Sequence, residues 1–350
     1  MVEELAARMV QLGHQVTCYN RRGRHVSGAD FDGERQGEHR GIRLKWVPTV
    51  DKKGLAAVTS SFYATLQAAF SDADVVHIHA EGPAYLCWLP RLMGKRVVVT
   101  VHGLDWQRDK WKHGLGAAFI RMGERMAVRW AHRIIVLSRN VQRYFQDTYG
   151  RDTDYIPNGV TAPRRIGPEI LAGLGLEKDG YVLFLGRLVP EKCPHLLIRA
   201  YRQLNTDKKL VIAGSSSDTD AYAAQLKDLA GDETNIVFTG FVQGQLLEAL
   251  YSNAWVYVLP SAVEGMPLSL LEAMSYGNCC LVSDIPECAD VVGSHGLTFP
   301  AGDENALRES LGQLCGDAAA VAAYRKTARE HVCSQFNWDT ITKQTMELYQ

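Results

Sequence analysis

Residues 261–272 read Ser-Ala-Val-Glu-Gly-Met-Pro-Leu-Ser-Leu-Leu-Glu and carry two acidic side chains, Glu264 and Glu272, with seven residues between them. The preceding run is β-branched and aromatic and ends at Pro260, and the following residues have apolar side chains at helical spacing. The pattern predicts a strand, a turn and a helix start. Such turns lie at the carboxyl ends of strands in a doubly wound parallel sheet, where free helix N–H groups favour an anion.

A second turn of the same kind follows the apolar run Tyr181–Leu185 and reads Gly-Arg-Leu-Val-Pro-Glu-Lys. Gly186 lets the backbone approach a ligand, Arg187 offers a planar fork of donors for phosphate oxygens, and Lys192 adds a compact positive charge. We expect the two turns to meet at one crevice. The spacing of Glu264 and Glu272 alone has a competing interpretation, in which the two carboxylates lie on a solvated face of a helix.

These residues, in this order, resemble the motifs of retaining nucleotide-sugar glycosyltransferases of the GT-B fold, specifically glycosyltransferase family 4 (glycosyl transferases group 1). The resemblance covers nearly the whole chain. It implies an α/β fold of two Rossmann-like doubly wound parallel-sheet domains that face each other across a crevice. It also implies that the Gly-Arg…Lys cluster grips the donor diphosphate, that Glu264 contacts the transferred sugar and that Glu272 holds the ribose hydroxyls.

The resemblance gives a set of donor-binding candidates from the two turns, with Glu264 assigned to catalysis: Gly186, Arg187, Lys192, Gly265, Met266, Leu268 and Glu272. The family often has glycine after the lysine, whereas this chain has Cys193. We therefore expect the positive charge to be kept there, although the local turn can differ.

The chain has 350 residues, of which 46% are hydrophobic, enough for two domains with sizeable cores. Strand and helix patterns alternate throughout, which favours parallel sheets with helices on both faces. We expect an N-terminal acceptor-side domain over 1–160, a linker over 161–178, a nucleotide-sugar-binding domain over 179–330 and, over 331–350, a helix that crosses back to the first domain.

The net charge of −1 hides an asymmetry, because residues 1–160 hold 23 Lys and Arg against 16 Asp and Glu, whereas the remainder holds 15 against 23. The sharpest basic feature is a row of four arginines spaced by four residues, which on one helix would form a stripe: Arg121, Arg125, Arg129 and Arg133. It is interpreted either as a solvated helix face or as a contact with an anionic membrane surface or a lipid-diphosphate acceptor. Nucleic acid is disfavoured, because the pI is about 6.8 and no binding motif is present.

His102 ends a strand-like run and is followed by glycine, so it should lie at the carboxyl edge of the sheet, facing the crevice from the other domain. In the family a histidine of this kind lies near the donor sugar and acceptor, and we assign it to catalysis. His77 is expected to be structural, and His79 is a minor crevice candidate. Further acceptor-side candidates are Asp105, Asn158, Arg108 and Lys110.

The chain opens on what resembles the first helix of the family, without the first strand and its glycine-rich loop. We therefore expect a sheet in the N-terminal domain whose central position is unfilled, and hypothesise that Met1 is not the native start or that the chain is a fragment. An exposed strand edge would favour aggregation. N-terminal sequencing of the natively expressed protein would test this, and a native start at Met1 would contradict it.

Several other classes are disfavoured. No apolar run is long enough to span a membrane and the acidic N-terminus does not resemble a signal peptide, so a cytoplasmic protein, peripheral at most to the inner membrane face, is expected. Eight cysteines without a C-x-x-C indicate reduced thiols. Asp152-Thr-Asp154 matches a metal-binding D-x-D but precedes a strand, so we interpret it as a loop and expect no metal or other cofactor.

The resemblance implies transfer of a sugar from a nucleotide-diphosphate donor, with retention at the anomeric carbon, to a glycan or lipid-linked acceptor in polysaccharide or lipopolysaccharide synthesis. Two alternatives remain open at this point. One is a sugar-nucleotide epimerase of the same fold, which would leave the basic features of the first half unexplained. The other is a catalytically impaired fragment or partner subunit.

Overall fold

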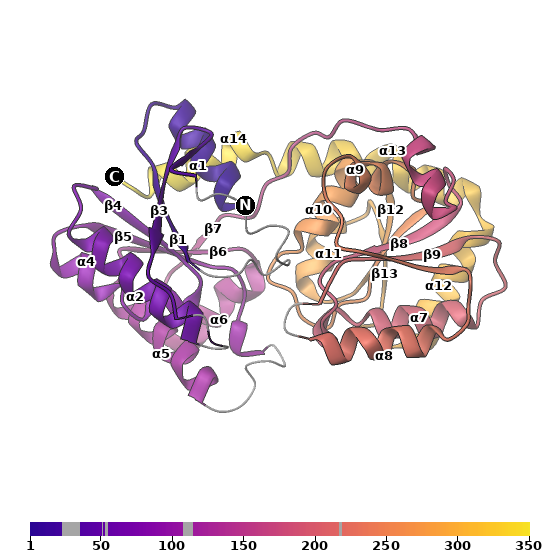
Figure 1. Cartoon of the computed structure of the whole chain (residues 1–350), viewed down its shortest axis with the longest axis horizontal. Coiled ribbons are helices and arrows are strands. Elements are labelled where there is room, and N and C mark those ends of the chain that lie inside the picture. The colour runs from indigo at the N-terminus through magenta and orange to yellow at the C-terminus, as the bar shows by residue number, and fades with distance from the viewer. Residues whose placement is uncertain (23–35, 51, 53–54, 108–114, 217–218) are drawn as a thin grey trace. The chain divides into compact units, whose positions relative to one another are not determined.

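The computed structural model describes residues 1–22, 36–50, 52, 55–107, 115–216 and 219–350. The chain forms two compact units, coloured from indigo to yellow along the sequence in Figure 1. The first unit comprises residues 1–158 and 338–350, and the second comprises residues 159–337. The C-terminal segment thus belongs to the same unit as the N-terminus.

The first unit contains α1 (Val2–Gln11), β1 (Thr17–Arg21), β2 (Glu38–His39), β3 (Ile42–Val47), α2 (Leu55–Ala69), β4 (Val75–His79), α3 (Glu81–Ala84), α4 (Trp88–Leu92), β5 (Arg96–Val101), the 3-10 helix η2 (Asp105–Gln107), α5 (Leu115–Trp130), β6 (Arg133–Val136), α6 (Arg139–Tyr149), β7 (Asp154–Tyr155) and α14 (Trp338–Glu347). The strands form a three-stranded sheet, β1-β3-β2, and a parallel four-stranded sheet, β4-β5-β6-β7. Among the described strands, β1 and β4 are edges of these two sheets and do not pair with each other.

The second unit contains the 3-10 helix η4 (Pro168–Leu174), β8 (Tyr181–Leu185), η5 (Pro190–Lys192), α7 (Pro194–Arg202), β9 (Lys209–Ala213), α8 (Asp220–Ala230), β10 (Ile236–Gly240), α9 (Gly244–Asn253), β11 (Val256–Leu259), α10 (Leu268–Ser275), β12 (Cys279–Ser283), α11 (Pro286–Val292), β13 (Leu297–Phe299), α12 (Glu304–Gly316) and α13 (Ala318–Gln335). Its six strands are all parallel, in the order β10-β9-β8-β11-β12-β13. Residues 161–178, expected as a linker, include η4, where Leu171 is fully buried against this unit.

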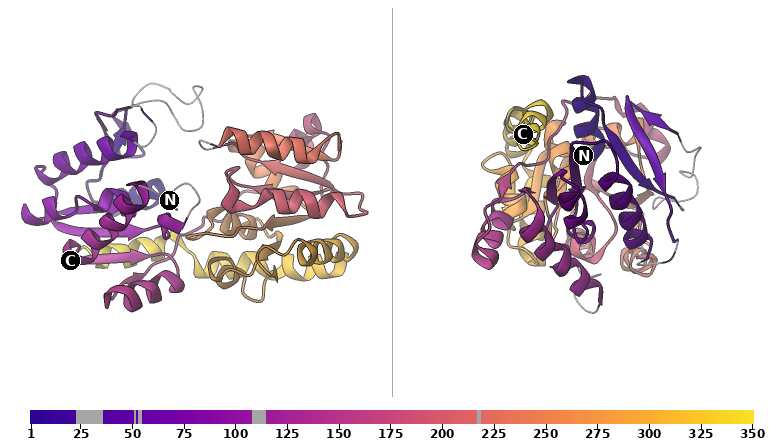
Figure 2. Two further views of the ribbon diagram at one scale, coloured as in Figure 1. Left: turned by 90° about the horizontal axis from the view of Figure 1, so that it is seen from below. Right: turned by 90° about the vertical axis from the view of Figure 1, so that its left-hand side faces the viewer.

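Helices cover both faces of the sheets, as the two views of Figure 2 show. In the second unit α7, α8 and α12 lie on one face, and α9, α10 and α13 lie on the other. The four sheet-centre strands β8, β9, β11 and β12 are buried almost throughout, which explains their near-continuous apolar sequences. The alternation of strands and helices that the sequence predicts therefore produces the layered α/β fold.

Strand β5 illustrates how one sequence serves two cores in the first unit. Successive side chains of a strand point to opposite faces. The odd-numbered valines from Val97 to Val101 pack in a cluster with α5 and α6, whereas Val98 packs with Trp338 of α14 on the other face. All of these valines are fully buried. Helix α14 thus completes the core of the first unit from the far end of the chain.

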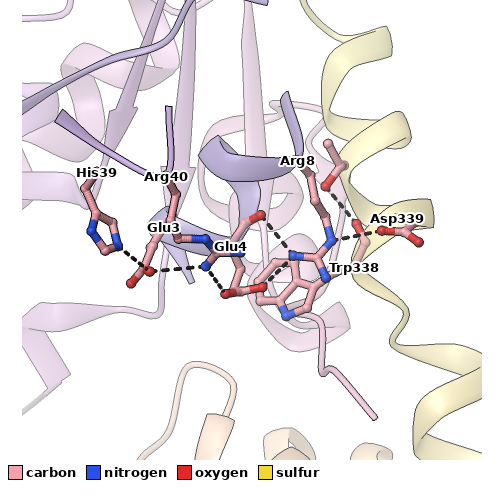
Figure 3. Close-up of polar contacts among 8 residues, drawn as sticks. Glu3, Glu4, Arg8, His39, Arg40, Trp338 and Asp339 are labelled. Atoms are coloured by element: carbon pink, nitrogen blue, oxygen red, sulfur yellow. Dashed lines mark hydrogen bonds and ion pairs between the residues drawn. The ribbon is translucent and has the colours of Figure 1, made fainter. Parts of the chain in front are cut away.

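A polar network reinforces the same junction (Figure 3). Arg8 of α1 donates through Nε to Asp339 of α14 at 2.9 Å and through Nη1 to Glu4 at 2.5 Å. Arg40 donates to the carboxylates of Glu4 and Glu3 at 2.6 and 3.1 Å. The hydrogen bond from His39 lowers the pKa of Glu3, and the contact with the Arg40 guanidinium lowers it further. The first helix, the β2–β3 turn and the last helix are thereby connected.

One sequence prediction about α5 is wrong. The helix ends at Trp130, so Arg133 lies on β6 and does not continue the helical row. Its Nε donates to Asp154 at 2.8 Å. Arg133 follows Arg129 by four residues, but this spacing has no helical meaning, because the helix ends between them and β6 begins at Arg133. The other three arginines are exposed on α5: Arg121, Arg125 and Arg129.

Candidate functional site

The two turns that carry the sequence motifs lie side by side in the second unit. Strands β8 and β11 are parallel neighbours, so their carboxyl ends open at the same edge of the sheet. The backbone N–H of Ala262, after β11, donates to the carbonyl of Glu191, after β8, at 2.8 Å. The expected meeting of the two turns is therefore present within this unit.

Lys192 and Glu264 form the central contact of this site. Lys192 Nζ donates to Glu264 Oε1 at 2.5 Å, and Ser261 Oγ donates to the same oxygen at 2.6 Å. The two charged side chains are only 12% and 7% exposed. Ser283 at the end of β12 in turn donates to the carbonyl of Ser261 at 2.5 Å. Glu264 Oε2 makes no hydrogen bond with the described residues, so only one oxygen of this carboxylate is fixed by its neighbours there.

Glu272 lies on α10, the helix that follows the turn with Glu264, and its surroundings are less polar than those of Glu264. Tyr251 Oη of α9 lies 3.1 Å from Glu272 Oε2, and Tyr257 Oη of β11 donates to Ser269 Oγ at 2.8 Å. Burial raises the pKa of Glu272, and the hydrogen bond from Tyr251 opposes that rise. The tyrosines position both the carboxyl group and the first turn of α10.

The strand ends around Gly186 allow a close backbone approach. The N–H of Gly186 donates to the carbonyl of Ala213 at 3.0 Å, and Gly214 follows with a φ of +140°. A Cβ on Gly214 would lie 1.8 Å from the carbonyl oxygen of Gly186. The Arg187 side chain is exposed beside this crossing, and it makes no hydrogen bond or ion pair with the residues that the structure describes.

Cys193 lies at the sharp turn between η5 and α7, directly after Lys192. Its φ of 51° and ψ of 36° lie in the left-handed region, which L side chains rarely adopt. The thiol donates to the carbonyl of Pro190 at 3.3 Å and is largely buried. The backbone between η5 and α7 therefore takes a left-handed conformation that glycine adopts without strain, and the cysteine side chain is strained there.

A second cluster lies at the carboxyl ends of β4 and β5 in the first unit. His102 Nε2 lies 3.2 Å from His79 Nδ1, and the two rings are stacked with centroids 5.4 Å apart. His77 stacks on His79 and contacts Thr100 Oγ1 and Tyr349 Oη, each at 2.7 Å. Burial lowers the pKa of His77 to about 3 and that of His79 well below its ordinary range, so both rings are neutral at pH 7.

The remaining predicted residues take varied positions. Gly265 and Met266 are buried in the turn before α10, and Leu268 is the first residue of that helix. Asp105 begins η2, three residues after His102. Asn158 is 4% exposed and is the last residue of the first part of the first unit. Arg108 and Lys110 lie outside the described residues.

Several site residues were not identified from the sequence. Ser261 and Ser283 fix Glu264, Tyr251 contacts Glu272, and Gly214 crosses the backbone of Gly186. The only available signal was for Gly214, which follows a strand as Gly186 does. Serine and tyrosine side chains inside apolar runs carry no pattern that separates a positioning role from ordinary core packing.

Two further features are absent from the described part of the chain. It contains no helix that is long and apolar enough to cross a membrane. Within the same residues, no group of three His, Cys, Asp or Glu side chains is arranged to hold a metal ion.

Comparison with known proteins agrees with both motifs. The family model "Glycosyltransferase Family 4" matches residues 1–164, and the model "Glycosyl transferases group 1" matches residues 168–331. The chain belongs to the glycosyltransferases of family 4 and is a glycosyltransferase. A relative, the alpha-maltose-1-phosphate synthase of Mycobacterium tuberculosis (strain CDC 1551 / Oshkosh), is 27% identical over 339 residues, which covers 86% of this chain and 85% of the synthase.

Two solved structures show the same fold. Sucrose-phosphate synthase from Thermosynechococcus elongatus has a TM-score of 0.83 at 22% identity, covering 99% of this chain and 91% of that one. HepE from Anabaena, solved in complex with UDP and glucose, has a TM-score of 0.76 at 19% identity, covering 88% and 86%. The α/β fold with parallel sheets is thus that of the GT-B glycosyltransferases.

Proposed function

We propose that this glycosyltransferase moves a sugar from a nucleoside-diphosphate donor to the hydroxyl of a glycan or lipid-linked acceptor, with retention at the anomeric carbon. The observation that supports this most is the contact between Lys192 and Glu264 at the carboxyl ends of β8 and β11. It places a cation and a carboxylate at the edge where parallel sheets bind nucleotides. The complex of the structurally similar HepE with UDP and glucose supports a donor of this class.

The donor diphosphate would lie against Arg187 and Lys192. Arg187 is exposed and can form a bidentate pair with phosphate oxygens, and Lys192 supplies a point charge. Negative charge grows on the departing phosphate as the glycosidic bond breaks. Cations that are fixed there before the reaction stabilise the transition state more than the ground state, which raises the rate.

Glu264 would orient the sugar hydroxyls through its Oε2 while Lys192 and Ser261 hold Oε1. Its negative charge also supports the positive ring carbon of the transition state. Glu272 would accept hydrogen bonds from the ribose. We infer front-face attack, in which the leaving phosphate takes the proton of the acceptor hydroxyl, with His102 on the acceptor side.

We further propose an acceptor from cell-surface polysaccharide or lipopolysaccharide synthesis. Residues 1–160 have an excess of Lys and Arg over Asp and Glu, which supports an anionic acceptor or an anionic membrane surface. The exposed arginines Arg121, Arg125 and Arg129 on α5 would each contribute roughly 1 kcal/mol near an anionic bilayer. In this proposal the enzyme is cytoplasmic and peripheral to the inner face of the membrane.

A donor panel tests the proposal. Hydrolysis and transfer would be measured with nucleotide sugars of different base and sugar, for the parent chain and for Glu264→Gln. We expect turnover with at least one donor, and a loss of about 100-fold or more in the variant, the size usual for removing one charge-stabilising group. Interconversion of the donor sugar without transfer would indicate an epimerase. Absence of binding and turnover with every donor would contradict the proposal.

A further inference from the structure

Two neighbouring carboxyl groups are buried in the first unit, and neither has been assigned a role so far. Glu81, at the start of α3, and Glu124, in the middle of α5, are both 0% exposed. The helices approach closely, because a Cβ on Gly123 would lie 2.0 Å from the carbonyl oxygen of Glu81. Buried carboxylates require compensation by hydrogen bonds, charges or protonation. We call Glu81 and Glu124 the acid pair.

Three aromatic donors surround Glu124. Tyr144 Oη donates to Glu124 Oε1 at 2.8 Å, Tyr149 Oη donates to the same oxygen, and Trp106 Nε1 donates to Oε2 at 3.3 Å. Such donors stabilise an ionised carboxylate. Glu124 is therefore the charged member of the acid pair.

Glu81 has the opposite surroundings. Its Oε2 accepts from the backbone N–H of Asp105 at 2.8 Å, but its buried Oε1 has no donor within the described residues. Burial raises the pKa of Glu81 to about 10, and the hydrogen bond to Glu124 adds to the rise. A proton on the Glu81 carboxyl would give it a hydrogen bond to donate to the Glu124 carboxylate. The acid pair then carries one proton and one negative charge.

Both members of the acid pair hold the segment that follows β5. Glu81 binds the backbone of Asp105, and Glu124 binds the indole of Trp106. Arg121 covers the Trp106 ring, with its guanidinium carbon 4.7 Å from the ring centroid. The residue before Glu81, Ala80, has φ 79° and ψ 157°, a strained conformation that persists only where the surroundings fix it.

We propose that the singly protonated acid pair is the positioning element of residues 102–107, and so fixes the histidine and the aspartate that we assign to the acceptor side. Neither carboxyl touches the reacting atoms in this scheme. The acceptor-side part of the inference rests on the proposed function, whereas the hold on the segment does not. Apolar residues of the same volume could fill the space but could not bind the Asp105 N–H and the indole N–H together.

Two matched substitutions test the inference: Glu81→Gln and Glu124→Gln. A glutamine at 81 reproduces a protonated carboxyl, since its amide can donate to Glu124 and its oxygen can accept from Asp105. A glutamine at 124 has one acceptor oxygen for the two tyrosine hydroxyls and the indole N–H. Its amide N–H₂ would face those donors that the oxygen does not accept from. We therefore expect the first variant to be tolerated and the second to release the segment.

The readouts are amide hydrogen exchange over residues 102–107 and the indole N–H resonance of Trp106. In Glu81→Gln we expect exchange within about 2-fold of the parent and an unchanged resonance. In Glu124→Gln we expect exchange at least about 10-fold faster and an upfield shift of the resonance, from loss of the charged acceptor. Equal effects of the two variants, or a larger effect of Glu81→Gln, would overturn the inference.

Two additions keep the test decisive. If Glu124→Gln does not fold, Trp106→Phe replaces it, because it removes only the indole donor, and unchanged exchange over residues 102–107 would overturn the inference. Binding of UDP, GDP and ADP is measured in parallel as a readout of the second unit, and we expect the Gln variants to match the parent within about 2-fold. If no nucleotide binds to any form, the proposed function fails, while the exchange data still decide the role of the acid pair.

Discussion

Replacing Glu264 by glutamine should tighten the binding of a nucleoside diphosphate while it lowers turnover by about 100-fold or more. In the ligand-free protein Lys192 is already engaged by Glu264 Oε1 at 2.5 Å. A diphosphate that binds Lys192 must compete with that carboxylate. Glutamine keeps the shape and a hydrogen-bond acceptor but removes the competing charge, so Lys192 becomes a stronger phosphate ligand.

The size of the effect follows from the geometry. Two unit charges about 4 Å apart attract by roughly 4 kcal/mol at an effective dielectric constant of about 20. Most of this is offset by the desolvation of two side chains that are only 12% and 7% exposed. We take about 1 kcal/mol as the net competition, which corresponds to nucleotide binding about 5-fold tighter.

Isothermal titration calorimetry with UDP, GDP and ADP measures this directly. The matched control is Glu191→Gln, which removes a carboxylate next to Lys192 in sequence without removing the contact, and we expect a change below about 2-fold. Lys192→Met should weaken binding about 10-fold or more. Unchanged or weaker binding by Glu264→Gln would refute the competition, and so would equal tightening by Glu191→Gln.

Three further outcomes are expected in the second unit. At Cys193, with its φ of 51°, glycine should give a protein about 1 kcal/mol more stable than alanine in urea unfolding, and a more stable alanine variant would contradict the left-handed turn. Gly214→Ala should lower the free energy of unfolding by more than about 3 kcal/mol or prevent folding, because the new Cβ would clash with the carbonyl of Gly186. In Gly186→Ala the new Cβ would meet only a side chain at 3.6 Å, and the free energy of unfolding should stay within about 1 kcal/mol of the parent. Similar losses in the two variants would refute the close approach of the two glycines. Burial raises the folded-state pKa of Glu272, so the stability of its protonated form is present at low pH and lost as the pH rises through that pKa. Glu272→Gln should therefore melt higher than the parent at pH 7.5 and equally at pH 4, and a lower melting point at pH 7.5 would contradict this.

Much of the fold could be predicted because the signals are local. The apolar run 181–185 and its following glycine give a strand and a turn from a few consecutive residues, and the same holds for the turn that carries Glu264. The contact between Lys192 and Glu264 needed one more step, the adjacency of β8 and β11, which follows from the doubly wound order of strands. The family resemblance supplied that order.

The prediction that failed and the contact that was missed have different causes. The position of Arg133 was wrong because nothing between Trp130 and the next strand marks the end of the helix. The acid pair was missed because Glu81 and Glu124 lie on different helices, and each is unremarkable in its own sequence context. A buried carboxyl differs from a solvated one only in what surrounds it, which the sequence does not show.

The two ends of the second unit lie together, and this makes that unit an insertion within the first. The N–H of Val160 donates to the carbonyl of Phe336 at 2.7 Å, and Val160 bridges to Asn337. The chain therefore leaves the first unit after Asn158 and re-enters it at Trp338, a short distance away. Exchanging residues 159–337 between family members would therefore replace the second unit, to which we assign donor binding, and leave the core around α14 intact. A chimera joined only after Asn158 would instead take α14 from the other family member, so the core of its first unit would contain a foreign helix.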